Sequence, residues 1–265
     1  RILLENQVDW ADQNAFLRAD VEWRFETFRG MDNHSQGDLR FRDVYADVKG
    51  EQFDLAVGQK RVTWGKLDEL VILDRVSPQD LTHFVLYDKQ ERKDPALLVQ
   101  HQWFGWEGVQ LETVFLPVFQ PSEQDFFGTN WAVFGHLKQA VAESPVYTAQ
   151  QKNLVSAISV QDDEGVTSRS LKNSQAAVRL RGRRGEVDYG IYYLNLYYTT
   201  PVLKERTPDG NLVKRFLFEP TAANLNALTT PGVSGESLRL TKAHPRVNAA
   251  GFDWETVWGL FGLRG

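Results

Sequence analysis

Hydrophobic and polar residues alternate with a period of two along several stretches of the chain. In residues 15–28, the odd-numbered positions up to Phe25 are all apolar, and the even-numbered positions from Arg18 to Glu26 are all charged. A helix would repeat its apolar residues every three or four positions, so this period predicts an amphipathic β-strand.

The same pattern turns back on itself in residues 174–200. Its first half sets three apolar residues against a row of three arginines, Arg179, Arg181 and Arg183. A polar turn at 184–186 follows, and a second alternating run, rich in tyrosine, completes a predicted β-hairpin. Residues on one face of a strand lie about 7 Å apart, so the arginines form a continuous charged row.

Further alternating stretches predict more strands, at 38–48, 53–64, 96–106, 109–119 and 246–258. With the ends of the chain they give about ten strands, joined alternately by short turns and by long connections at 65–95, 120–173 and 201–245. A slip in the alternation near Arg42 and Asp43 predicts a β-bulge. We expect short helices around 136–143 and at Ser77–Asp80, where Pro78 occupies a first helical position.

The contrast between the two strand faces favours a particular fold class. Apolar faces rich in aromatic residues need a large apolar partner, and a lipid bilayer around a barrel provides one, with the charged faces lining a wet lumen. We therefore expect an all-β fold, an antiparallel transmembrane β-barrel. The chain forms one domain, residues 1–265, with 65–95 as an inserted loop that folds inward and constricts the lumen. The alternative for this loop is a surface excursion closed by a small helix. A soluble all-β protein is the alternative, with the charged faces in water. Because the chain ends at LFGLRG within a predicted strand, we expect it to be incomplete at the C-terminus.

Composition narrows the function classes. The net charge of −5 gives no basic field for nucleic acid. The mean hydropathy is −0.41, and no run of about 18 apolar residues predicts a membrane helix. The absence of cysteine excludes thiolate metal sites and disulfides. Aromatic residues make up 12% of the chain, which suits interfacial girdles or a carbohydrate-binding surface.

No catalytic constellation stands out in the sequence. The five histidines are scattered without metal-ligand spacing, and neither a nucleophile elbow nor a phosphate-binding loop is present. We therefore expect no enzymatic activity, no metal and no cofactor.

The charges are the remaining functional signal. The expected basic wall of the lumen consists of Arg18, Arg24, Lys60, Arg61, Arg179, Arg181 and Arg183, with Arg40 and Arg42 as further members. The acidic residues of the inserted loop are Asp68, Glu69, Asp74, Asp80 and Asp88. A basic wall opposite an acidic loop would set a transverse field across a pore and select among ions. The alternative is that the arginines pair locally with Asp20, Glu22, Asp253 and Glu255 and only hold the wall in shape.

A motif in the middle of the chain resembles one from a known group. Gly58 and Gln59 lead into Trp64-Gly65, and the stretch 74–80, with Pro78 near its end, reads DRVSPQD. This resembles the G-x-Q, WG and D-x-V-N-P-x-D pattern of proteobacterial outer-membrane porin-like barrels, a group near the alginate-export-type and uncharacterised porins. Ser77 replaces the commoner Asn.

The resemblance implies the cell outer membrane of a Gram-negative bacterium and a larger barrel of 14–18 strands, with lipid bilayer and lipopolysaccharide as surroundings. It implies no enzyme and is silent on the substrate. We expect a channel for passive passage of a small hydrophilic solute, anions included. The alternatives are a structural barrel that holds another envelope protein and a soluble all-β binding protein. Exposure of Phe252 and its neighbours on the apolar face of 246–258 would favour the membrane.

Overall fold

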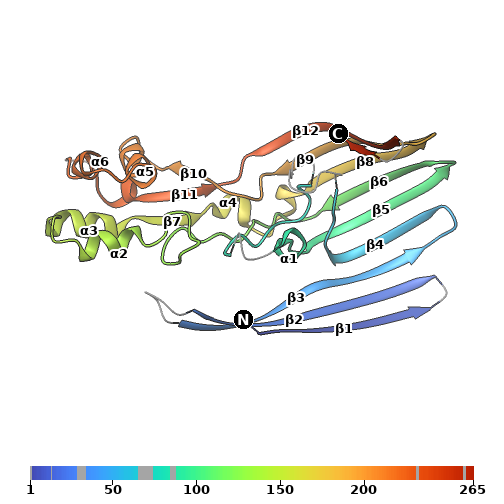
Figure 1. Ribbon diagram of the computed structural model, residues 1–265, viewed down its shortest axis with the longest axis horizontal. Helices are drawn as coiled ribbons and strands as arrows, with labels where there is room; N and C mark the ends of the chain where they lie inside the picture. The colour runs from blue at the N-terminus through green and yellow to red at the C-terminus, as the bar shows by residue number, and fades with distance from the viewer. Residues whose placement is uncertain are drawn as a thin grey trace.

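The computed structural model describes residues 2–12, 14–28, 34–64, 74–83, 88–230, 233–258 and 261–265. Within them the dominant element is a ten-stranded antiparallel sheet in which each strand pairs with its neighbours in sequence (Figure 1). Its strands are β1 (Ile2–Asp12), β2 (Ala15–Phe28), β3 (His34–Lys49), β4 (Phe53–Lys60), β5 (Ala96–Trp106), β6 (Val109–Leu116), β8 (Gln175–Arg184), β9 (Val187–Tyr197), β12 (Arg246–Trp258) and β13 (Phe261–Arg264). The all-β antiparallel fold expected from the alternation is confirmed.

The connections differ at the two ends of this sheet. Short turns join β1 to β2, β3 to β4, β5 to β6, β8 to β9 and β12 to β13, and an up-and-down order places all of them at one end. The long connections gather at the other end, and we call the two ends the turn end and the loop end. The register between β2 and β3 shifts where Arg42 and Asp43 face Asp20, which confirms the predicted bulge.

The backbone conformation and the closeness of β3 require a glycine at position 58. Its φ is +140°, and a Cβ there would lie 2.4 Å from the carbonyl oxygen of Val44 and 2.7 Å from Cα of Tyr45 on the neighbouring strand. Any other residue would clash with β3, so the glycine of the motif serves strand pairing.

A second, smaller unit lies at the loop end, at the left of Figure 1. Its sheet has the order β10–β11–β7, with β11 antiparallel to β10 and parallel to β7. The strands are β7 (Ser159–Asp162), β10 (Val202–Glu205) and β11 (Arg239–Ala243). The helices are α2 (Leu137–Glu143), α3 (Ala149–Ala157), α5 (Gly210–Phe218) and α6 (Ala222–Ala227), and Val155, Ile158, Val213, Leu228 and Leu240 are at the centre of their own hydrophobic core. Shorter helices are α1 (Lys89–Arg92), α4 (Glu164–Thr167), η1 (Leu171–Asn173) and η2 (Gly235–Leu238), and Leu238 of η2 belongs to the core of the smaller unit.

Several local predictions were wrong. Ser77–Asp80 forms no helix, because Gln79 and Asp80 make isolated β-bridges to Lys93 and Glu123. The fourth strand ends at Lys60, four residues early, because Arg61 turns its backbone N–H to the carboxylate of Asp43. The poorly patterned start forms β1, and the stretches expected to be irregular or polar loops, 120–173 and 201–245, build the smaller unit. The helix expected at 136–143 is present as α2.

Among the described residues, no helix is long and apolar enough to cross a membrane, a result that bears on helices alone.

Candidate functional site

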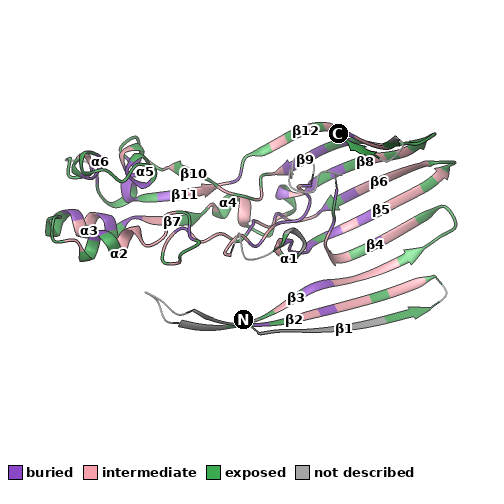
Figure 2. Ribbon diagram, viewed as in Figure 1, coloured by how far each residue is buried: buried purple, intermediate pink, exposed green. Residues whose placement is uncertain are grey.

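The two faces of the large sheet have inverted polarity. On one face, which we call the outer face, large apolar side chains are exposed. They include Trp23, Leu39, Phe41, Ile191, Tyr193 and Phe252, with exposed fractions between 49% and 60%. On the opposite, inner face, charged side chains are buried, and Glu22, Glu112 and Asp253 are 1–3% exposed. Figure 2 shows buried and more exposed residues following one another along β8 and β9. Proteins in water normally bury the apolar set, so this inversion is the most informative property of the chain.

The test residues on β12 agree with this inversion. Ala250 and Phe252 are exposed and Trp254 is partly exposed, whereas the side chain of Trp258 lies outside the described residues. Between them, Asp253 is buried on the inner face.

The inserted segment packs on the inner face through ion pairs to β2 and β3. The carboxylate of Asp80, which is fully buried, accepts hydrogen bonds from Arg24 at 2.7 Å and from Arg40 at 3.1 Å. Arg24 also donates to Glu22 on its own strand at 2.9 Å. Because both arginines come from the sheet and Asp80 comes from the segment, these bonds fix the segment to the wall.

A second set of bonds between the sheet and the neighbouring connections lies beside these ion pairs. Arg42 donates to Asp94 at 2.8 Å and lies 3.1 Å from Glu22, and Arg40 donates to Glu123 at 2.8 Å. Asp94 belongs to the segment and Glu123 to the connection after β6. We call these residues, Glu22, Arg24, Arg40, Arg42, Asp80, Asp94 and Glu123, the clamp.

The motif is tied together at its own core. Lys93, fully buried, pairs with Asp74 and donates to the Thr63 hydroxyl at 2.9 Å. Asp74 in turn accepts the backbone N–H of Trp64 at 3.0 Å. These polar contacts hold the Thr63-Trp64 part of the motif against its D-x-V-S-P-x-D part. Ser77 joins them, because its hydroxyl accepts the N–H of Val62 at 2.9 Å.

Trp64 connects this part of the motif to the sheet. Its indole N–H donates to Glu112 at 2.9 Å, and its ring lies under the guanidinium of Arg179 at 5.2 Å. Arg179 pairs with the same carboxylate of Glu112, and Gln100 donates to it at 2.6 Å. A buried charge is tolerable only with such partners, and Glu112 has three.

Burial shifts the acidity of two carboxyls in the segment. Burial raises the pKa of Asp94 to about 6, against the opposing attraction of Arg42. Burial also acts to raise the pKa of Asp80, but hydrogen bonds from Thr82 and Arg24 outweigh it and hold the pKa below its usual value. Asp80 therefore stays charged in the clamp, and Asp94 gains a proton in mildly acidic solution.

The contacts of the basic residues predicted to line the lumen differ from those expected with the acidic loop. The row Arg179, Arg181 and Arg183 bonds to Glu112, to the side-chain amide oxygen of Gln110 and to the turn at Gly185, because neighbouring strands already supply acceptors. Asp68 and Glu69 of the acidic loop lie outside the described residues, so the expected arrangement of the row opposite the whole loop stays a prediction. Arg24, with Arg40 and Arg42, meets the described part of the segment. Local pairing, the alternative, holds for Arg24 with Glu22. The row also pairs locally, but with Glu112 and Asp188 in place of the expected Asp253 and Glu255.

The remaining predicted residues have individual positions. Arg61 pairs with Asp43, and Lys60 lies 4.7 Å above the ring of Tyr45. Arg18 is partly buried on the inner face of β2, and Asp88 is exposed and accepts the N–H of Glu91. Pro78 is buried, and its carbonyl accepts the N–H of Asp94; Gln59 is partly buried on β4. Asp68, Glu69 and Gly65 lie outside the described residues.

The sequence did not single out Glu112, Lys93, Asp94 or Glu123. For Glu112 a signal was present, because in the alternating stretch 109–119 it falls on the face predicted to point inward, among apolar residues. Lys93, Asp94 and Glu123 lie in stretches without a period, where nothing marks which charge is buried.

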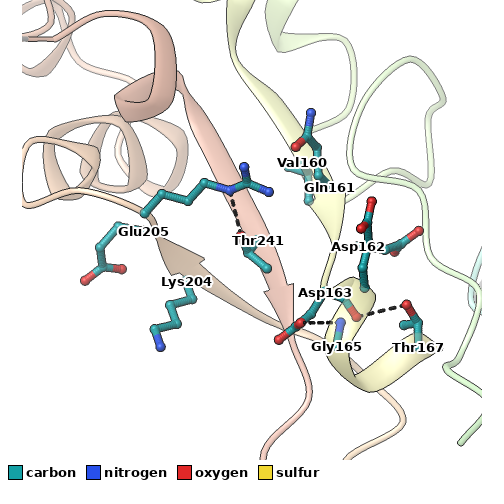
Figure 3. Close-up of a pocket in the computed structure, with 11 residues that line it drawn as sticks. Val160, Gln161, Asp162, Asp163, Gly165, Thr167, Lys204, Glu205 and Thr241 are labelled. Atoms are coloured by element: carbon teal, nitrogen blue, oxygen red, sulfur yellow. Dashed lines mark hydrogen bonds between the residues drawn. The ribbon is translucent and has the colours of Figure 1, made fainter. Parts of the chain in front are cut away.

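Two of the cavities among the described residues contain several charged groups that could meet a solute. The larger, about 1080 Å³, lies in the smaller unit and is lined by residues of β7, α4, β10 and β11 (Figure 3). Its charges are largely engaged: Asp163 accepts the N–H of Gly165, Lys242 pairs with Asp162, and Arg206 donates to Thr241. The smaller, about 570 Å³, lies at the turn end of the inner face beside Arg181, Arg183 and Asp253. In the described part of the chain, no group of three or more histidine or acidic side chains is placed to hold a metal ion.

Comparison with known families identifies the chain at family level. A profile described as protein of unknown function (DUF1302) matches residues 6–259. The chain belongs to this family. No curated protein and no solved structure matches it. The DUF1302 match covers β2 to β12 in full, so the matched region of this chain includes most of the large sheet and the whole of the smaller unit.

Proposed function

We propose that this DUF1302 chain forms part of the wall of an outer-membrane β-barrel that lets small hydrophilic solutes pass, with the inserted segment, described at 74–83 and 88–95, constricting its lumen. The inverted polarity of the large sheet carries the proposal. Exposed apolar area costs about 25 cal/mol per Å² in water, and a bilayer removes that cost while a wet lumen solvates the inner face.

The borders of the outer face support a membrane band. At the loop end, Arg246 donates to Asn195 at 2.9 Å, and Asn195 and Asn248 bond to each other on the outer face. At the turn end, Trp103 and Trp106 pack edge to face at 4.9 Å. From Asn195 to the turn, β9 advances about 26 Å. After tilting, this covers most of an apolar band of roughly 25 Å between a polar boundary and an aromatic girdle.

The proposed barrel has more strands than the ten described. The strands β1 and β13 are the outermost in the sheet, and unpaired backbone groups are not tolerated in hydrocarbon. Additional strands that pair with these edges would give the 14–18 strands expected of porin-like barrels.

The decisive experiment reconstitutes the full protein in planar bilayers. We expect stepwise ionic conductance and heat-modifiable migration in gels, the sign of a folded barrel. Folded, membrane-inserted protein without conductance would refute the channel. Monomeric protein that stays soluble without detergent would refute the barrel itself.

A structural barrel that holds another envelope protein is the second candidate. The observation that favours it is the extent of packing on the inner face: Trp64, Leu98, Val114 and Leu194 form a buried apolar cluster next to the clamp. Co-purification of a protein lodged in a non-conducting barrel would establish this candidate over the channel.

A further inference from the structure

The cavity at the turn end of the inner face is built around one row of side chains. Strand pairing places Gln110, Arg181, Gly190 and Asp253 next to one another on β6, β8, β9 and β12. Arg181 and Asp253 thus flank a glycine, with their Cα atoms two strand spacings, about 10 Å, apart. All four strands contribute to the wall of the proposed lumen.

Gly190 leaves the space that Asp253 occupies. A Cβ at this position would lie 2.6 Å from Oδ1 of Asp253 and 2.7 Å from the hydroxyl of Tyr192. The carboxylate therefore leans over the glycine, towards the strand that carries Arg181. A side chain at 190 would displace it, so the glycine serves the position of the carboxylate.

The Asp253 carboxylate is only half satisfied. Its Oδ2 accepts a hydrogen bond from the Tyr192 hydroxyl, whereas Oδ1 accepts none from any residue that the structure describes. Asp253 is 3% exposed and lines the cavity of about 570 Å³. A buried carboxylate oxygen without a donor is costly, and the soft χ2 torsion of aspartate lets it turn an oxygen to the cavity.

Arg181 supplies the opposite charge. It is exposed and also lines the cavity, and one guanidinium nitrogen donates to the Gln110 amide oxygen. A guanidinium carries five N–H donors, so this one bond leaves donors for a carboxylate. Nearby Arg183 lies 3.8 Å from Asp188 and is thereby balanced. Glu107, at the turn between β5 and β6, also lines the cavity. Next to Gly190, the cavity presents one cationic side chain, Arg181, on one side and one anionic side chain, Asp253, on the other.

We propose that this cavity is a subsite for small zwitterions, whose carboxylate pairs with Arg181 and whose ammonium pairs with Asp253. Neither an anion nor a cation alone satisfies both side chains, which favours amino-acid-like solutes over simple ions. The inference rests on the proposed function, because it names the solute class of that lumen.

The test compares three probes of matched size: β-alanine, propionate, which lacks the ammonium, and ethylammonium, which lacks the carboxylate. Binding to the folded, detergent-solubilised protein is measured by calorimetry. We expect β-alanine to bind at least about tenfold more tightly than either other probe, since each charged contact contributes about one power of ten or more.

Two variants and a control localise the site. Asp253→Asn and Arg181→Gln each weaken β-alanine binding by about tenfold. Arg184→Gln on the same strand, an exposed residue outside the cavity, leaves it unchanged. Heat-modifiable migration verifies that each variant folds. If Asp253→Asn fails to fold, Arg181→Gln still tests the site, because Arg181 is exposed and its replacement should not prevent folding.

The outcomes separate this inference from the channel. Equal binding of propionate and β-alanine, or undiminished β-alanine binding by both variants, overturns the zwitterion site. Conductance in KCl is measured in parallel without any probe. A conducting wild type with no preference for β-alanine refutes only the subsite, whereas selective binding by a non-conducting barrel refutes only the channel.

Discussion

Removing the carboxylate of Asp80 should release the inserted segment from the wall. In Asp80→Ala, Arg24 loses its contact at 2.7 Å and Arg40 loses its contact at 3.1 Å, although Arg24 keeps Glu22 and Arg40 keeps Glu123. Breaking a buried ion pair by removing one partner costs about 3–5 kcal/mol. Because both arginines retain a partner, we expect the lower part of this range, about 3 kcal/mol.

The measurement is urea-induced unfolding in lipid vesicles, followed by tryptophan fluorescence. Glu186→Ala, at an exposed turn, is the matched control and should change the free energy of unfolding by less than about 0.5 kcal/mol. A second readout is conductance, which should rise or fluctuate in Asp80→Ala as the segment leaves the wall. If Asp80→Ala unfolds within about 0.5 kcal/mol of the wild type, the clamp does not hold the segment and the argument from its ion pairs fails.

Three further results are expected. Phe252→Arg, in the middle of β12 and 58% exposed, should cost about 2–4 kcal/mol in bilayers; a cost near zero would contradict a lipid-facing outer surface. Between about pH 4 and 6 the folded protein holds a proton on Asp94 more tightly than the unfolded chain does, since its pKa is raised to about 6. The free energy of unfolding should therefore fall with rising pH across this window, by up to about 3 kcal/mol. Asp94→Asn should remove this slope in urea titrations, and a slope that persists would assign it to another group. Val213→Asp places a charge in the fully buried core of the smaller unit and should make that unit sensitive to protease while the large sheet keeps its heat-modifiable migration; loss of both together would show that the two fold as one.

The large sheet could be predicted because its signal is local. Alternation in 15–28 and 174–200 specifies both the strand and its two faces, and short turns specify which strands pair. The bulge at Arg42 could also be located from a slip in the same period. The start of the chain could not be predicted as β1, because its mixed residues alternate too weakly.

The clamp could be predicted only in part. Period two places Arg24 on the inward face, but its partner Asp80 lies 56 residues away in a stretch without a period. Sequence spacing cannot say which arginine such a carboxylate meets. Nor could it show that Glu112 and Gln110 on β6 supply acceptors for Arg179 and Arg181. Gly190 shows the same limit, since its role depends on Asp253 of β12, which pairs with β9 although β10 and β11 come between them in the chain.

The parallel pairing of β7 with β11 has a consequence for the order of assembly. These strands come from separate connections, about 80 residues apart, and the hairpin β8–β9 lies between them. Closing so long a loop is slow unless the intervening chain is already compact. We therefore expect the hairpin to form before β7 pairs with β11, so that formation of the three-stranded sheet would report that β8 and β9 have already paired.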